Sequence, residues 1–173
     1  IADEVITALA DWEMCVAPLG LAAPADLPCD ARWIAARAPG TVAQALSEAG
    51  LWRFEAPSPL DDNDYWHRAR FTAQGMRLLR FHGLASIADV FIDGAPVLSS
   101  DNMFHAHELV FEARGTHDIH ICFRGLTPAF ERKARRAKWR TRLAQPPGLR
   151  NVRSSRDVMK ESISAAASYV RSR

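Results

Sequence analysis

A short alternating run followed by a two-residue turn, near the middle of the chain, is the feature that most constrains the fold. Ala88, Val90 and Ile92 are apolar and stand at every second position, which is the period of a β-strand with one buried face. Asp93 and Gly94 then separate this run from a second apolar run, and both residue types tolerate the positive φ of a tight turn. The sequence therefore predicts a β-hairpin at this position.

Similar alternating runs recur on both sides of the hairpin. They occupy residues 65–71, 76–84, 104–113 and 117–126, with turn residues between them. Short strands with turn signals about every eight to twelve residues are typical of a β-sandwich or jelly roll, and argue against alternating βαβ units. We therefore expect an all-β fold.

One short helix is predicted before the first long strand. Thr41 is a suitable N-cap, and Gln44, three residues later, completes a capping box. Val42 and Leu46 fall on one face of this segment, and Gly50 stands where a helix would end.

The length and composition are those of one globular domain with some additional chain. The 173 residues are 48% hydrophobic and 24% charged, and no apolar run approaches the ~20 residues that span a bilayer. We expect no membrane partner and a cytoplasmic location. A periplasmic location stays open, because a chain that starts at Ile1 can have lost a leader.

Positive charge is concentrated in the second part of the chain. Residues 101–173 hold 15 Lys and Arg against 7 Asp and Glu, and many of these cations lie in the run at 132–142. A basic run with one tryptophan is compatible with an interaction module for nucleic acid or an acidic partner. Nucleic acid is the less favoured partner, because no recognised nucleic-acid module surrounds the run.

Catalytic and metal-binding motifs are absent from the sequence. There is no nucleophile elbow, no zinc-protease motif and no glycine-rich phosphate loop. His105 and His107 would share one face of a strand, but no acidic or thiol ligand has a matching spacing. The acidic run at 61–64 lacks the glycine and the glutamate of a calcium loop. We therefore expect no metal, no cofactor and no catalytic residue in this chain.

Three segments together resemble a known family. Residues 39–52, 62–71 and 79–104 are similar, in order and spacing, to the N-terminal domain of glycoside hydrolase family 2, and most similar to its β-mannosidase branch. The basic segment at 139–155 also resembles that branch. The resemblance implies a galactose-binding-like jelly-roll β-sandwich over residues 1–155, which would pack against a catalytic TIM barrel that this chain lacks.

The resemblance also implies roles for five residues. Asp62, Asp64 and Asn102 would hydrogen-bond a β-mannoside or related saccharide, whereas Met103 and Phe104 would be buried where the domain docks on the barrel. The family's catalytic glutamates belong to the barrel. The chain alone would therefore be inactive, and would be part of a glycoside hydrolase only if the parent protein is longer.

The last segment has a different resemblance. Residues 156–173 are similar to a helix of the proteolytic domain of Lon-type proteases, so a C-terminal helical tail of foreign origin is expected. Asp157 would cap this helix, and Met159, Ile163 and Val170 would belong to its apolar stripe. Lys160 and Ser162 are not expected to act as a catalytic dyad.

Three functions remain open at this point. The first is the non-catalytic N-terminal domain of a β-mannosidase-like enzyme, and the second is a free-standing carbohydrate-binding module. The third is an interaction module that uses residues 132–142. Aromatic platforms would favour the second function, and the candidate tryptophans are Trp33, Trp52, Trp66 and Trp139. Tryptophan in a sandwich more often belongs to the core.

Overall fold

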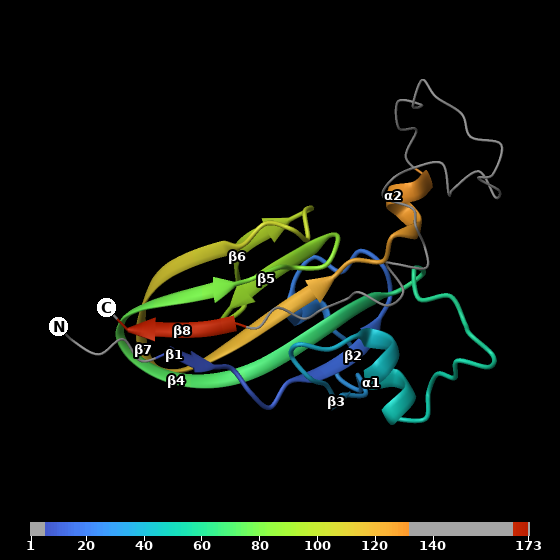
Figure 1. The fold of residues 1–173 in the computed structure, drawn as a ribbon, viewed down its shortest axis with the longest axis horizontal. Coiled ribbons are helices and arrows are strands. Elements are labelled where there is room, and N and C mark those ends of the chain that lie inside the picture. The colour runs from blue at the N-terminus through green and yellow to red at the C-terminus, as the bar shows by residue number, and fades with distance from the viewer. Residues whose placement is uncertain (1–5, 132–167, 173) are drawn as a thin grey trace, which may run out of the picture.

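The computed structural model describes residues 6–131 and 168–172. It is built mainly of β-strands, with few and short helices (Figure 1). In chain order the elements are β1 (Ile6–Ala8), β2 (Glu13–Ala17), the 3-10 helix η1 (Pro24–Asp26), β3 (Ile34–Ala35), α1 (Val42–Glu48), β4 (Asp64–Phe81), β5 (Ala88–Ile92), β6 (Ala95–Ser100), β7 (His107–Phe123), α2 (Thr127–Glu131) and β8 (Ser168–Ser172). Within these residues, no helix is long and apolar enough to cross a membrane.

Two long strands, β4 and β7, form the centre of the sheet. They pair antiparallel along their whole length, from Tyr65 opposite Phe123 to Phe81 opposite His107. Both strands curve back at one end of the molecule, so that each contributes to two facing layers (Figure 1). The bend contains Gly75 and Gly115, both with positive φ, which a residue without a Cβ adopts at little cost.

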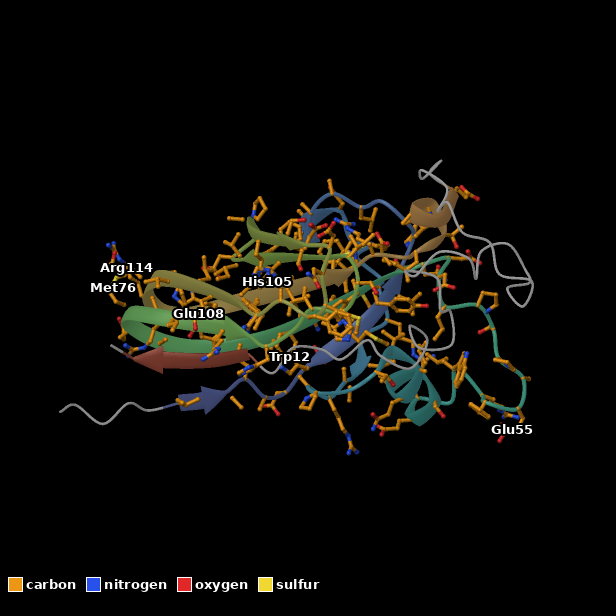
Figure 2. The ribbon with its side chains drawn as sticks, turned by 45° about the horizontal axis from the view of Figure 1, so that its top comes forward. Trp12, Glu55, Met76, His105, Glu108 and Arg114 are labelled. Atoms are coloured by element: carbon orange, nitrogen blue, oxygen red, sulfur yellow. The ribbon has the colours of Figure 1, made fainter. Side chains whose placement is uncertain are left out.

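The long strands differ from the sequence prediction in one respect. The sequence predicted separate strands at 65–71 and 76–84, and again at 104–113 and 117–126, whereas each pair is one continuous strand. Gly75 and Gly115, which lie between the predicted strands, allow the chain to bend without ending the strand. Met76 and Arg114 lie at this bent end, opposite the end that carries Glu55 (Figure 2).

The predicted hairpin and helix are both confirmed. β5 and β6 pair through the Asp93–Gly94 turn, and β5 also pairs with β7. In α1, the Thr41 side chain accepts a hydrogen bond of 3.0 Å from the backbone N–H of Gln44, but the Gln44 side chain donates to Oε1 of Glu48 and does not complete the predicted capping box. The apolar face of α1 is buried.

The layers enclose one large core, which we call the inner core. It joins side chains from both halves of β4 with side chains from β2, β5, β7 and α1. A smaller outer cluster covers the opposite face of β2, β4, β5 and β7, and is closed by residues 21–33. Its buried members are Cys15, Ala17, Trp66, Phe91 and Cys122.

The end of the expected helical tail is a strand. Ser168–Ser172 forms β8, which pairs antiparallel with residues 77–81 of β4 and with β1. The pairing supplies hydrogen-bond partners to an edge of β4 that would otherwise be open. Tyr169 and Val170 also favour extended backbone over helix. The remainder of the expected tail, residues 156–167 and 173, lies outside the described residues, as does the basic run at 132–142.

Candidate functional site

We call the layer that contains the first half of β4, the second half of β7, β2, β5 and β6 the first layer, and the layer that contains the other halves of β4 and β7 with β8 the second layer. The expected sugar-contact residues all lie at one end of the first layer. Tyr65 pairs with Phe123, Phe123 with Ala88, and Ala88 with Ser100. Residues just outside these four positions therefore meet where the four neighbouring strands begin or end. We call this row of strand ends the sheet edge. The loop before β4 and the loop after β6 are three strand steps apart, which corresponds to about 14 Å.

Asp64 is held in the protein interior at this edge. Its side chain is only 1% exposed. Oδ1 accepts a hydrogen bond of 2.8 Å from the backbone N–H of Gly125, and Oδ2 accepts one of 2.9 Å from that of Gly20. Nη1 of Arg124 lies 2.9 Å from the same Oδ2. These three donors direct the Asp64 carboxylate inward.

Arg124 connects Asp64 to the neighbouring strand and to the loop after β2. Its Nε donates to Oδ2 of Asp89 on β5 at 2.7 Å, and its Nη1 also donates to the backbone carbonyl of Leu21 at 2.6 Å. The guanidinium lies 5.7 Å from the centroid of the buried Trp66 ring. Arg124 therefore ties β4, β5 and the loop after β2 to the end of β7.

Asp62 lies beside this network, and its side chain is exposed. Oδ1 of Asp62 accepts a hydrogen bond of 2.6 Å from the hydroxyl of Thr127 at the start of α2. Gly125 lies below the same loop. A Cβ at that position would stand 2.6 Å from the backbone oxygens of Asp61 and Asn63, so only glycine allows this approach.

Asn102 organises the loop after β6. Its Oδ1 accepts a hydrogen bond of 3.0 Å from the backbone N–H of Phe104, and its backbone N–H donates to Oγ of Ser100 at 3.3 Å. This is the local bonding of an Asx turn. Phe104 is 88% exposed, whereas Met103 is partly buried.

Two further contacts fix the position of this loop. The backbone oxygen of Met103 lies directly over Gly83, where a Cβ would be only 2.6 Å away. Nε2 of His107 lies 3.0 Å from Oγ of Ser100. The loop therefore presents Phe104 to solvent from a defined backbone.

The structure brings Asp62 and Asp64 together and places Asn102, Met103 and Phe104 on a separate loop at the same edge. Direct sugar contacts and docking contacts stay predictions for all five residues. The sequence did not indicate Arg124, Asp89 or Thr127. The one available signal was that Asp89 alternates with buried residues on β5 and therefore faces away from the inner core.

The tryptophans divide between core and surface. Trp66 is fully buried in the outer cluster and has no accessible ring face. Trp33 is partly buried and lies under the guanidinium of Arg68, 4.0 Å from it, so this ring already has a cation–π partner. Trp52 is partly buried, and its ring is 6.4 Å from that of Phe54. Trp139 lies outside the described residues.

The histidines do not form a metal site in the described part of the chain. His105 and His107 have their ring centroids 5.0 Å apart. No group of three or more potential metal ligands occurs among residues 6–131 and 168–172. The imidazole of His107 instead contacts the hydroxyl of Ser100.

Comparison with known proteins identifies the family. A family model for the galactose-binding-like domain of glycosyl hydrolase 2 matches residues 20–159. The chain therefore belongs to this family, and its all-β, galactose-binding-like jelly-roll fold is the one that the sequence resemblance implied. No curated protein sequence matches the chain.

Several solved enzyme structures share the fold. A β-D-mannosidase from Dictyoglomus thermophilum is 18% identical with a TM-score of 0.59, and the match covers 78% of this chain and 17% of that one. A family 2 β-galacturonidase from Eisenbergiella tayi is 20% identical with a TM-score of 0.51, covering 70% and 19%. A Faecalibacterium prausnitzii β-glucuronidase is 16% identical with a TM-score of 0.52, covering 70% and 21%.

The chain spans about a fifth of the length of these enzymes. The similarity thus covers one domain of a larger type of protein.

Proposed function

We propose that this chain is the non-catalytic N-terminal domain of a longer, β-mannosidase-like glycoside hydrolase. The observation that carries the proposal is the exposed Phe104 on an ordered loop, in a chain that belongs to a glycosyl hydrolase 2 domain family. A large apolar side chain held at the surface by its own loop fits burial against another part of the parent enzyme. Met103 would be buried with it.

The same sheet edge would lend polar contacts to the sugar site. Asp62 and Asn102 are the two expected contact residues with exposed side chains. Asp64 is buried and already accepts hydrogen bonds with both oxygens. We therefore assign Asp64 a positioning role beneath the loop that carries Asp62.

A β-mannoside is the favoured saccharide, and the structural neighbours define the competing class. The β-mannosidase neighbour supports a neutral sugar, whereas the other two enzymes are a β-galacturonidase and a β-glucuronidase. A free-standing carbohydrate-binding module is the second candidate function, because the exposed side chains of Asp62 and Asn102 can hydrogen-bond sugar hydroxyls. A cytoplasmic location is part of the proposal and agrees with three unpaired cysteines.

The test has one experiment for each role. Docking is measured by sedimentation of this chain with the separately purified catalytic portion of its parent enzyme, using Phe104→Ala and the exposed control Phe54→Ala. Sugar contact is measured by ligand-observed NMR with methyl β-D-mannopyranoside and methyl β-D-glucuronide, using Asp62→Ala and Asn102→Ala.

The two readouts separate the candidate functions. Association that Phe104→Ala weakens and Phe54→Ala preserves supports the docking domain. Sugar binding by the chain alone, without any association with the catalytic portion, would instead support the free-standing module and contradict the docking role.

A further inference from the structure

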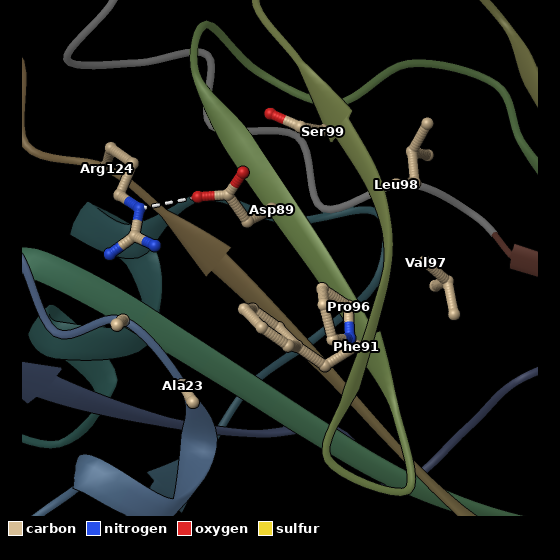
Figure 3. A pocket seen from close by; sticks show the side chains of 9 residues that line it. Ala23, Asp89, Phe91, Pro96, Val97, Leu98, Ser99 and Arg124 are labelled. Atoms are coloured by element: carbon tan, nitrogen blue, oxygen red, sulfur yellow. Dashed lines mark hydrogen bonds and ion pairs between the residues drawn. The ribbon is translucent and has the colours of Figure 1, made fainter.

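An open groove of about 500 Å³ lies on the outer face of the first layer (Figure 3). The loop that carries Ala23 forms one wall, and the β5–β6 hairpin forms the other. The loop at 101–106, by contrast, leaves this layer for the start of β7, where His107 pairs with Phe81 in the second layer. The groove therefore lies apart from Asp62 and from the loop at 101–106, although it shares Arg124 and Asp89 with the network described above.

The strand register explains which side chains line the groove. Asp89 and Phe91 alternate with the inner-core residue Val90, so they face outward. Ser99 pairs with Asp89, and Pro96 pairs with Phe91, which places the four residues on one patch. Phe91 and Pro96 give the groove an apolar part, and Asp89 gives it a polar part.

Arg124 completes the polar part of the groove. Its ion pair with Asp89 uses Nε and Oδ2, at 2.7 Å, and its bonds to Asp64 and Leu21 use Nη1. Nη2 of Arg124 and Oδ1 of Asp89 remain outside these bonds. Both residues line the groove, so a guanidinium and a carboxylate stand side by side in its wall.

This arrangement matches two adjacent hydroxyl groups. One hydroxyl donates to the carboxylate and the next accepts from the guanidinium, while the C–H face of a sugar ring packs on apolar side chains. The polar pair is already held by internal bonds, so binding requires little further ordering of these side chains.

The local charge argues for a neutral ligand. Arg124 is the cation of a cluster that holds two carboxylates, Asp64 and Asp89. An incoming uronate or phosphate would meet a net negative cluster, because the positive charge of Arg124 is already compensated. A neutral pyranose avoids this repulsion.

We propose that this groove is a second saccharide-binding site, which takes a neutral pyranose with adjacent hydroxyls. The proposal goes beyond the docking function and does not depend on Asp62, Asn102 or Phe104. The volume lies within the ~300–1,000 Å³ range of small-ligand sites.

The first experiment is an amide-resolved NMR titration of the full 173-residue chain with methyl β-D-mannopyranoside. Shift changes are expected at Ala23, Asp89 and Ser99, with saturation at millimolar sugar. A parallel titration uses glucuronate. Stronger binding of glucuronate at the groove would overturn the assignment of a neutral ligand.

Two pairs of variants test the location. Ser99→Trp is expected to fill the groove and abolish the shifts, whereas Ala95→Trp, at an exposed position on the same strand, should preserve them. Asp89→Asn should weaken binding roughly tenfold, equal to about 1.4 kcal/mol. Asp118→Asn is its matched control, because Asp118 is paired with Arg70 in the same layer.

Thermal melting of each variant confirms that it is folded before it is titrated. The proposal is overturned if the chain shows no groove shifts at millimolar sugar, or if Ser99→Trp leaves the shifts unchanged. It is also overturned if the shifts lie only at residues 101–104. If Asp62→Ala removes the shifts near residue 62 but leaves the groove shifts unchanged, the result bears only on the proposed function. The groove site is then still supported.

Discussion

Nη1 of Arg124 lies 2.9 Å from Oδ2 of Asp64, at a point where the carboxylate is almost completely buried. The pair joins the first residue of β4 to the residue that follows β7. The same guanidinium holds Asp89 on β5 and the backbone of Leu21. One guanidinium therefore fixes the sheet edge that carries the proposed sugar contacts and one wall of the groove.

Removing the charge of Asp64 is expected to destabilise the domain. Asp64→Asn leaves Arg124 without its buried partner and should lower the free energy of unfolding by about 3–5 kcal/mol. Urea unfolding followed by tryptophan fluorescence measures the change. Asp62→Asn is the control and should cost under about 1 kcal/mol, because its side chain is exposed. Equal losses in the two variants would contradict a structural role for Asp64.

Stability should fall with acid because of one buried histidine. His67 is 3% exposed, its ring meets that of Phe123 edge-on at 5.1 Å, and its Nδ1 has no partner among the described residues. Burial lowers the pKa of His67 to about 4 from an ordinary value near 6.5.

The sign of the effect follows from these two pKa values. The unfolded chain takes up a proton near pH 6.5 and the folded chain only near pH 4, so acid favours unfolding between these values. The full contribution is present above about pH 6.5, and about 3 kcal/mol is lost by pH 4. Urea midpoints across this range should fall less steeply in His67→Gln than in the exposed control His105→Gln. Parallel curves would show that His67 is not the group responsible.

Gly83→Ala is expected to displace the loop that presents Phe104. The added Cβ would stand 2.6 Å from the backbone oxygen of Met103, so the loop must move. Amide NMR shifts at Asn102, Met103 and Phe104 should change. Association with the catalytic portion should weaken although Phe104 itself is retained.

Gly94→Asn is the matched control for this variant. Gly94 has open space around its Cα and a φ of +81°, which asparagine adopts more readily than most residues. Unchanged shifts at 102–104 in Gly83→Ala would mean that the close approach does not position the loop.

The three cysteines should react at very different rates. Cys29 is exposed, whereas Cys15 and Cys122 are buried in the outer cluster. Burial raises the pKa of Cys15 to about 11 and raises that of Cys122 further above its usual range. The thiolate is the reactive form, so a disulfide reagent should label one thiol quickly in the folded chain and all three in urea. Rapid labelling of Cys15 or Cys122 without denaturant would show that residues 21–33 do not seal the outer cluster.

Local patterns predicted the local structure well. The Thr41 cap, the Asp93–Gly94 turn and the alternation in β5 each depend on neighbouring residues, and each was confirmed. The bend in β4 was not predicted, because a glycine that ends a strand and a glycine that bends one have the same local signature. The strand β8 was also missed, since its partners on β4 lie far away in the chain.

The candidate site was predictable only in part. The family resemblance pointed to Asp62, Asp64 and Asn102, and register places them at one sheet edge. Burial separates Asp64 from the other two, and no spacing rule reveals burial of a polar side chain. Arg124 was missed because its partners, Asp64 and Asp89, become its neighbours only when three strands align.

The continuous pairing of β4 with β7 has a consequence for the order of folding. The pair Phe81 and His107 closes a shorter stretch of chain than the pair Tyr65 and Phe123, and that stretch contains the β5–β6 hairpin. Closing the shorter loop first costs less entropy, so we expect the ribbon to zip from Phe81 toward Tyr65. Each added pair then brings the Asp64 end nearer to Arg124. The sheet edge that carries the candidate site would be among the last parts to form, and substitutions there should accelerate unfolding more than they slow folding.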